Sequence, residues 1–229
     1  MCPSVAHEPL TQSVEDYLKA IYRLSLNGQP AATSEIAQHL ALAAPSVSGM
    51  IKRLSELGLL DHAPYKGVQL TPDGRRLALR MVRRHRILEA YLVAFLGYGW
   101  EVVHEEAERL EHAVSDALIE RMANALGDPH FDPHGDPIPA ADGTIAEVIY
   151  TPLSEIASGE TVVVRRADTN HPDRLRYIAS YGLTPGARVT VIDRQPFHGP
   201  VTVAVDGKRR VLGDEIARLL LCARPEALA

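Results

Sequence analysis

Two shortages in the sequence exclude several classes of protein. The 229 residues include only two cysteines, Cys2 and Cys222, at opposite ends of the chain. A disulfide framework and a thiolate metal cluster are therefore not expected. No apolar stretch approaches the roughly 18 to 20 residues that a membrane helix needs, and residues 1–11 carry no basic region followed by an apolar one. We therefore expect a cytoplasmic protein without a membrane partner.

Sequence motifs of common enzyme classes are missing as well. No P-loop and no Gly-x-Gly-x-x-Gly accompanies an expected strand-to-helix turn. The His-Glu-x-x-His motif of zinc proteases, begun at His104, would need a second histidine where Glu108 stands. We therefore do not expect an enzyme, although a metal-binding enzyme or a metal-storage bundle stays open as an alternative.

What the chain does contain is typical of a globular protein with more than one domain. Hydrophobic residues make up 46% and charged residues 23% of the 229 residues, which suits two or three small packed domains. The net charge of -5 is unevenly divided. Residues 1–86 hold eleven Lys and Arg against seven Asp and Glu, whereas residues 87–229 hold thirteen against twenty-two. A basic N-terminal module on an acidic body is typical of a DNA-binding protein with a further task.

Three short helices and a hairpin are predicted in the N-terminal third. Apolar residues recur at helical spacing over residues 13–26, 33–40 and 44–57, and Ser13 is a candidate N-cap for the first helix. Residues 59–70 contain two short apolar runs around a Pro-Tyr-Lys-Gly turn, which predicts a β-hairpin. Three helices followed by a hairpin predict a winged helix-turn-helix.

Two longer amphipathic helices are predicted next. Apolar residues keep helical spacing from Thr71 to about Gly97, and again over residues 100–126. Two such helices cannot bury their apolar faces alone. We therefore expect them to pack on the winged domain and on a second copy of the chain, and a two-fold dimer also suits a palindromic DNA operator.

The last part of the chain is predicted to be a small β domain. Residues 128–143 hold four prolines, which indicates a linker or extended loop and a domain boundary. Asp206-Gly207 is a hairpin signal between strands. The β-rich runs predict an SH3-like barrel and cover residues 161–165, 188–192 and 201–205. The expected domains are residues 1–73, 74–143 and 144–229.

Histidine and glutamate residues at helical spacing form a candidate metal site. His104, Glu108, Glu111 and His112 would fall within about 100° of arc on one helix face. Carboxylate and imidazole ligands without thiolates favour Mn(II), Fe(II) or Zn(II) over Cu(I). The plainer alternative is a solvated face with pairwise contacts between side chains. The two histidines of the Pro-rich loop, His130 and His134, could also attract a metal, but residues in such loops are more often exposed, and we interpret them so.

Four stretches of the sequence resemble the diphtheria toxin repressor family. They are Asp16–Tyr22, Ala44–Ser48, His85–Glu89 and His104–His112. The resemblance implies a mainly α fold with a small β domain: a winged helix-turn-helix, a helical dimerisation domain and a C-terminal SH3-like (FeoA-like) β-barrel. It also implies a metal-dependent regulator, usually a repressor of metal-homeostasis genes, that binds double-stranded DNA at a palindromic operator as a homodimer.

The resemblance also implies two sets of metal ligands. Iron-dependent members tend to have Met and Cys where Asp16 and Glu108 stand, so the two acids favour Mn(II), with Fe(II) as the alternative. In the barrel, Arg174 cannot act as a ligand and His171 is the remaining candidate. The implied ligands are Asp16, Glu108, Glu111 and His112 for a primary site, and His85, Glu89, His104 and His171 for an ancillary site.

The resemblance places the DNA-reading surface on the third helix and the hairpin. Gly49 stands where some members have a glutamine that contacts a base, so base reading is expected to be relaxed or to depend on DNA shape. Metal is expected to link the first helix, through Asp16, to the dimerisation helix. The expected DNA-binding residues are Thr33, Ser34, Pro45, Ser46, Ser48, Gly49, Lys52, Arg53 and Lys66.

Overall fold

The computed structural model describes residues 11–26, 28–63 and 67–225. These residues form two compact units. The first unit contains the residues up to Arg84 together with Pro139–Thr144, and the second contains His85–Ile138 and the chain from Ile145 onward. Helix α4, Pro72–Leu96, therefore contributes to both units. The boundary between these two compact units lies inside this helix.

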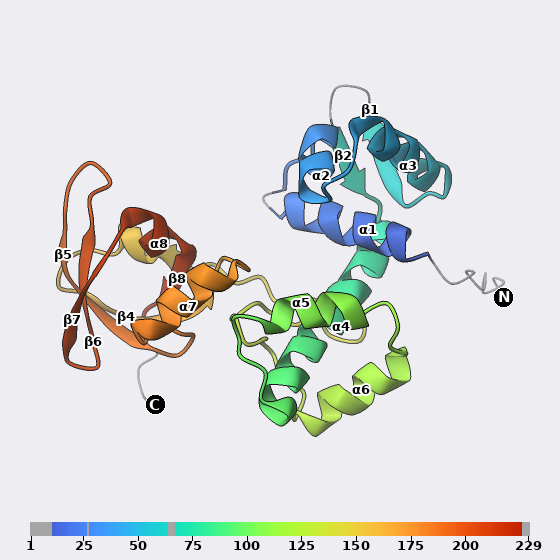
Figure 1. The fold of residues 1–229 in the computed structure, drawn as a ribbon. Coiled ribbons are helices and arrows are strands. Elements are labelled where there is room, and N and C mark those ends of the chain that lie inside the picture. Colours follow the sequence, from blue (N-terminus) through green and yellow to red (C-terminus); the bar gives the residue numbers. More distant parts are fainter. Residues whose placement is uncertain (1–10, 27, 64–66, 226–229) are drawn as a thin grey trace. The chain divides into compact units, whose positions relative to one another are not determined.

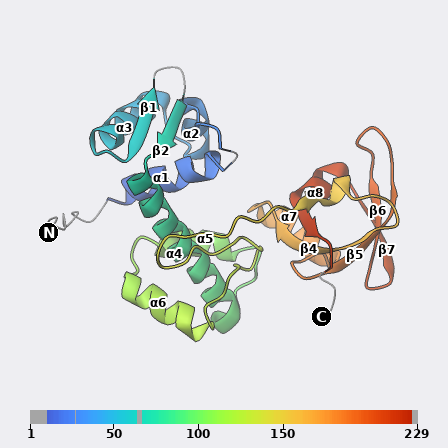
Figure 2. The ribbon, with the colours of Figure 1, turned by 180° about the vertical axis from the view of Figure 1, so that it is seen from behind.

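The first unit contains the predicted winged helix-turn-helix (Figure 1). Strands β1 and β2 pair antiparallel, and Val68 of β2 also bridges to Ala31, which precedes α2. Seen from behind, the hairpin lies beside the three helices (Figure 2). The apolar residues at helical spacing, among them Leu18, Ile36 and Leu54, form the buried core of this unit. Its elements are α1 Gln12–Leu24, α2 Thr33–His39, α3 Ala44–Glu56, β1 Leu60–Ala63 and β2 Gly67–Leu70.

The helix starts differ in detail from the sequence prediction. Thr11, not Ser13, is the N-cap of α1, and its side chain makes no capping hydrogen bond. At α2 the backbone N–H of Ala32 donates to the carboxylate of Glu35 at 2.9 Å, so a carboxylate satisfies a donor that the helix leaves open. The predicted tip of the hairpin, Tyr65 and Lys66, lies outside the described residues.

The predicted helix over residues 100–126 is in fact two helices, α5 Val103–Leu110 and α6 Asp116–Ala125. Ser115 starts the second one, because its Oγ accepts a hydrogen bond from the backbone N–H of Leu118. Residues from α4, α5, α6 and the following loop share one core, which includes Ile87, Ala107, Ile119 and Ile138. None of the helices in the described ranges has the length and apolar character needed to cross a bilayer.

The C-terminal part contains a six-stranded antiparallel sheet with the strand order β3-β8-β4-β5-β6-β7, in agreement with the predicted SH3-like fold. The register shifts between Val164 and Arg166 in β4 and between Val191 and Asp193 in β5. Such irregularities bend strands and let a small sheet curl round a core. The strands are β3 Thr151–Pro152, β4 Thr161–Ala167, β5 Arg188–Arg194, β6 Val201–Val205, β7 Lys208–Leu212 and β8 Leu220–Ala223.

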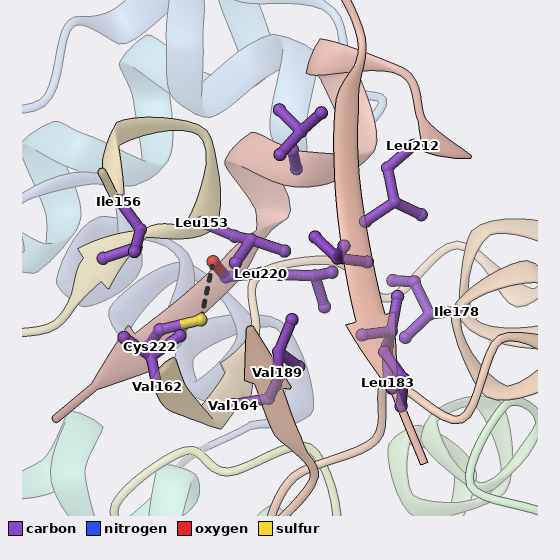
Figure 3. Packing of buried hydrophobic residues seen from close by; sticks show 14 of the residues in the cluster. Leu153, Ile156, Val162, Val164, Ile178, Leu183, Val189, Leu212, Leu220 and Cys222 are labelled. Atoms are coloured by element: carbon purple, nitrogen blue, oxygen red, sulfur yellow. Dashed lines mark hydrogen bonds between the residues drawn. The ribbon is translucent and has the colours of Figure 1, made fainter. Parts of the chain in front are cut away.

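Three short helical segments cover this sheet: a 3-10 turn at Leu153–Glu155, α7 Pro172–Ser180 and α8 Asp214–Leu219. Figure 3 shows their apolar side chains and those of the strands converging on one core, with Leu153 and Val189 fully buried. The predicted hairpin turn between β6 and β7 is confirmed, because Asp206 and Gly207 both have positive φ, at 48° and 73°.

Candidate metal centres and DNA-binding surface

Helices α4 and α5 bring three predicted ligands together inside the second unit. His85 and Glu89 lie one turn apart on α4, and both are buried. His104 lies on α5 and is half-buried. The i, i+4 spacing places His85 and Glu89 on one face of α4, and His104 meets them from α5.

The three donor atoms form a nearly equilateral triangle. His85 Nε2 lies 2.9 Å from Glu89 Oε1 and 2.9 Å from His104 Nδ1, and His104 Nδ1 lies 3.1 Å from Glu89 Oε1. Ligands about 2.1 Å from a metal and at right angles to each other are about 3.0 Å apart. The triangle therefore fits one face of an octahedral divalent cation, and a hydrogen-bonded proton can occupy the same donors without the cation.

The other ring nitrogen of His85, Nδ1, contacts Glu111. Glu111 is the C-cap of α5, its side chain is fully buried, and its Oε2 lies 2.6 Å from His85 Nδ1. Its other oxygen, Oε1, lies 3.5 Å from His112 Nε2. Glu108 is more exposed, and its Oε1 lies 3.6 Å from His85 Nδ1 and 3.6 Å from His104 Nε2. Glu108, Glu111 and His112 thus gather at the end of α5, although the helix itself ends at Leu110.

The other two predicted ligands lie on α1 and at the start of α7. Asp16 lies on α1 in the first unit, where its side chain is half-buried. Its participation in a centre with residues of the second unit stays a prediction. His171 is the N-cap of α7 and is exposed. The barrel residue that reaches the cluster is its neighbour Asn170, whose amide Nδ2 lies 3.0 Å from His104 Nε2.

A further group of possible ligands was missed by the sequence analysis. Glu89, Asp132 and His134 are all buried and can offer ligand atoms within 4.8 Å of one another. Glu89 Oε2 lies 3.7 Å from His134 Nδ1. The interpretation of the loop histidines as exposed is therefore wrong for His134, which is 3% exposed. The available signal was an Asp-x-His pair in the Pro-rich loop, which composition alone assigned to a linker.

The loop is buried because it packs on both neighbours. Arg86 of α4 donates to the carbonyl of Pro137, and its Nη2 donates to Asp136 Oδ1 at 3.2 Å. Gly135 has φ +88°, and a Cβ there would lie 1.9 Å from the carbonyl oxygen of Arg165 in β4, so only glycine fits. On the same edge, the N–H of Ala167 donates to the carbonyl of His134 at 2.9 Å.

The buried groups shift one another's pKa. Burial would raise the pKa of Glu89, but the charge of His85 and hydrogen bonds with His104, His134 and His85 lower it well below its usual value. Burial, followed by the charges of Asp136 and Glu89, raises the pKa of Asp132 to about 7. Burial would lower the pKa of His134, but Glu89 and Asp132 raise it overall. The cluster thus holds more negative charge than its surroundings solvate, which suits a bound cation.

The chemistry of the donors fits the metals that the sequence indicated. Every donor in these groups is an imidazole nitrogen or a carboxylate oxygen, and Cys222, a free cysteine, is buried in the core of the barrel. Imidazole and carboxylate sets suit Mn(II), Fe(II) and Zn(II). A cation bound here would supply the positive charge that balances these carboxylates. The chain's own residues orient the donor atoms toward it.

Helix α3 presents most of the residues predicted to contact DNA. Val47, Ile51 and Leu54 face the core. Thr33 is half-buried at the start of α2, and Lys66 lies outside the described residues. Ser48 Oγ donates back to the carbonyl of Ala44, and Lys52 Nζ lies 3.9 Å from exposed Glu56. The exposed predicted residues are Ser34, Pro45, Ser46, Ser48, Gly49, Lys52 and Arg53.

A winged helix-turn-helix followed by a buried His/Glu cluster defines a DNA-binding protein that responds to metal. Comparison with family models supports this class along the chain. Residues 9–68 match the N-terminal DNA-binding domain of iron-dependent repressors, residues 71–140 match their metal-binding and dimerisation domain, and residues 151–224 match the FeoA domain. The chain belongs to the iron-dependent, or diphtheria toxin, repressor family of metal-dependent transcriptional repressors.

The names of similar proteins mention both iron and manganese. The iron-dependent repressor IdeR of Mycobacterium leprae is 35% identical over 88% of this chain and 92% of its own length. The diphtheria toxin repressor of Corynebacterium diphtheriae is 31% identical over 92% of this chain and 96% of its own. A solved manganese-dependent transcriptional repressor in complex with manganese is 41% identical, covers 93% of this chain and 100% of its own, and has a TM-score of 0.84.

Proposed function

We propose that this repressor responds to Mn(II) and controls metal-homeostasis genes. The observation that carries the proposal is the thiolate-free set of buried nitrogen and oxygen donors around α4 and α5. The primary site would use Asp16, Glu108, Glu111 and His112. The ancillary site would use His85, Glu89 and His104, with His171 as a further candidate ligand. Fe(II) is the second candidate, favoured by the iron-dependent relatives.

Glu108 is the residue that favours manganese most directly. It stands where iron-dependent members tend to have a cysteine, and a carboxylate oxygen is the harder ligand. Asp16 likewise replaces a thioether sulfur by a carboxylate. Two hard donors at these positions lower the preference for the softer iron(II) and zinc(II) ions relative to manganese(II).

The proposed metal response is a shift between conformational states. Asp16 belongs to α1 of the DNA-binding module, and its proposed partners belong to the end of α5. A cation that binds all of them favours the state in which they meet, by a coupling typically of about 1 to 3 kcal/mol. By reciprocity, DNA that selects this state must tighten metal binding by the same factor.

The DNA target is proposed to be a palindromic operator bound by a homodimer. Pro45, Ser46, Lys52 and Arg53 on the exposed face of α3 supply contacts to phosphates and base edges. A second copy of the chain would cover exposed apolar residues of the helical part, namely Phe95, Leu96, Val102 and Leu118. Because its target is genomic DNA, the protein would act in the cytoplasm.

A metal titration tests the proposal. Chelator-stripped protein is titrated with Mn(II), and free Mn(II) is followed by electron paramagnetic resonance. Saturable uptake by the wild type, lost when Glu111→Ala is combined with His112→Ala, supports the site. The control Glu105→Gln changes an exposed carboxylate on the same helix and should leave uptake unchanged. Absence of uptake by the wild type contradicts the manganese assignment.

A second experiment distinguishes manganese from iron. Random DNA is selected for binding under anaerobic conditions with Mn(II) or with Fe(II), for the wild type and for Asp16→Met combined with Glu108→Cys. The wild type should recover a two-fold symmetric sequence with Mn(II), and the double variant should shift its response toward Fe(II). Equal responses of the two proteins to both metals would remove the role given to Asp16 and Glu108.

A further inference from the structure

His85, His104 and His134, the three histidines around Glu89, share one pattern of contacts. Each has one ring nitrogen directed at Glu89 and the other directed at a group outside the ligand triangle. For His85 the outer partner is Glu111, at 2.6 Å from Nδ1. For His134 it is the carbonyl oxygen of Trp100, at 2.7 Å from Nε2. For His104 it is the amide of Asn170, at 3.0 Å from Nε2, which is nearer than the carboxylate of Glu108 at 3.6 Å.

The outer partner decides which nitrogen can bind a cation. A neutral imidazole has one N–H and one lone pair, so a metal on one nitrogen requires the proton on the other. The carbonyl of Trp100 can only accept, so His134 must carry its proton on Nε2 and leave Nδ1 toward Glu89. The carboxylate of Glu111 imposes the same choice on His85, whose Nε2 then points into the triangle.

Asn170 is the corresponding partner of His104, and it comes from the barrel. We propose that Asn170 is a positioning residue of the metal centre: its amide oxygen accepts the Nε2 proton of His104 when a cation is bound at Nδ1. This inference rests on the proposed metal-binding function and names a residue that the ligand sets do not contain.

The geometry separates this role from that of a ligand. Asn170 approaches Nε2, whereas the triangle with His85 and Glu89 is formed by Nδ1, which lies on the other side of the ring. An amide can also serve both states of the site. When Nδ1 carries a proton, the NH2 group of Asn170 donates to Nε2, and the 3.0 Å distance between Nδ2 and Nε2 fits this arrangement. A half turn of the amide then presents oxygen to an Nε2 proton.

The local structure of the barrel fixes where Asn170 lies. Thr169, the preceding residue, is buried, and its Oγ1 accepts a hydrogen bond from the N–H of His171 at 3.2 Å. The strand β4 ends at Ala167, which is hydrogen-bonded to His134 of the loop. The segment from Ala167 to α7 is thus held at both ends, so the side chain of Asn170 can set the plane of the His104 ring.

Substitutions at position 170 test the need for an acceptor. Removing a partner of this kind typically weakens metal binding about 10- to 100-fold. Asn170→Ala should therefore weaken one Mn(II) ion per chain by about this factor in the titration with chelator-stripped protein. Asn170→Asp keeps an acceptor and should bind Mn(II) at least as tightly as the wild type. The matched control is Arg174→Ala, at an exposed position on α7 whose side chain cannot act as a ligand, which should bind as the wild type does.

Histidine NMR supplies a readout that a general effect on folding would not give. In protein loaded with diamagnetic Zn(II), the Nε2 proton of His104 should be observed in the wild type and in Asn170→Asp, and should exchange rapidly with water in Asn170→Ala. If alanine at this position unfolds the barrel, seen as exposure of the Cys222 thiol, the apolar variant Asn170→Leu of similar size replaces it.

The outcomes separate the two proposals. Failure of the wild type to bind metal contradicts the proposed function itself. Wild-type binding with unchanged affinity in Asn170→Ala overturns the role of Asn170 alone. An aspartate variant as weak as the alanine variant also overturns it, because the loss would then not depend on an acceptor.

Discussion

Asp132 offers a test of the buried cluster that needs no metal. Its Oδ1 accepts hydrogen bonds from the backbone N–H groups of His134 at 2.8 Å and Asp136 at 3.0 Å. Its Oδ2 lies 3.5 Å from Arg86 Nε. Burial and the nearby carboxylates nevertheless raise its pKa to about 7. Asp132→Asn keeps a carbonyl oxygen for the two backbone donors and removes the charge.

Because the pKa of Asp132 is raised, the wild type should lose folding stability as the pH rises. The folded metal-free protein holds a proton on Asp132 up to about pH 7, whereas the unfolded chain releases it near the ordinary aspartate pKa of 3.8. The stabilisation by this proton is complete below the unfolded pKa and is lost as the pH rises through the folded pKa. Between pH 5 and pH 8 the wild type should lose about 3 kcal/mol, at 1.36 kcal/mol for each pKa unit between pH 5 and the folded pKa.

The asparagine variant does not titrate at this position, so its free energy of unfolding relative to the wild type should rise by up to about 3 kcal/mol over the same range. Urea unfolding in the presence of chelator, at pH 5 and pH 8, measures this difference. The fluorescence of Trp100 follows the region, because its ring stacks on His134 with centroids 5.6 Å apart. Asp128→Asn, an exposed carboxylate in the same loop, is the control and should show no such change. An equal effect of Asp132→Asn at both pH values would refute the reasoning.

Three further predictions concern other parts of the chain. Burial raises the pKa of Cys222 to about 12, so in a Cys2→Ser variant a disulfide reagent at pH 8 should react only after unfolding; rapid reaction of the folded protein would contradict this. Leu153→Ala should lower the free energy of unfolding by about 2 to 5 kcal/mol, whereas Ile149→Ala, at a 97% exposed position, should change it little in the same urea titration. Leu118→Glu should shift the protein toward monomer in sedimentation analysis; an unchanged dimer would place the interface elsewhere.

The spacing of apolar residues predicted some helices well. The apolar spacing of α1, α3 and α4 survives in the structure, because each helix buries the face that the spacing marks. It failed over residues 100–126, where apolar residues continue through a break. The signal for the break was Ser115 followed by Asp116 in the first turn of α6, a local capping preference that a long apolar pattern obscured.

The candidate site was predictable only in the part that lies on helices. His85 and Glu89 share a face because they are one turn apart, which the sequence states directly. Asp132 and His134 enter through a loop whose prolines suggested a linker, and its burial depends on Arg86 and on the contact of Gly135 with β4. Asn170 is 66 residues from its partner. No spacing rule relates positions that only tertiary packing joins.

The buried carboxylates link the proposed metal centre to the stability of the second unit. Glu89 uses both oxygens, Oε1 toward His85 and His104 and Oε2 toward His134. Burial would raise the pKa of Glu89, but the charge of His85 and hydrogen bonds with His104, His134 and His85 lower it, whereas burial and the nearby carboxylates raise the pKa of Asp132. A divalent cation bound here would supply positive charge to these carboxylates. Its binding free energy would therefore add to the stability of the folded unit, since an unfolded chain presents no such cluster.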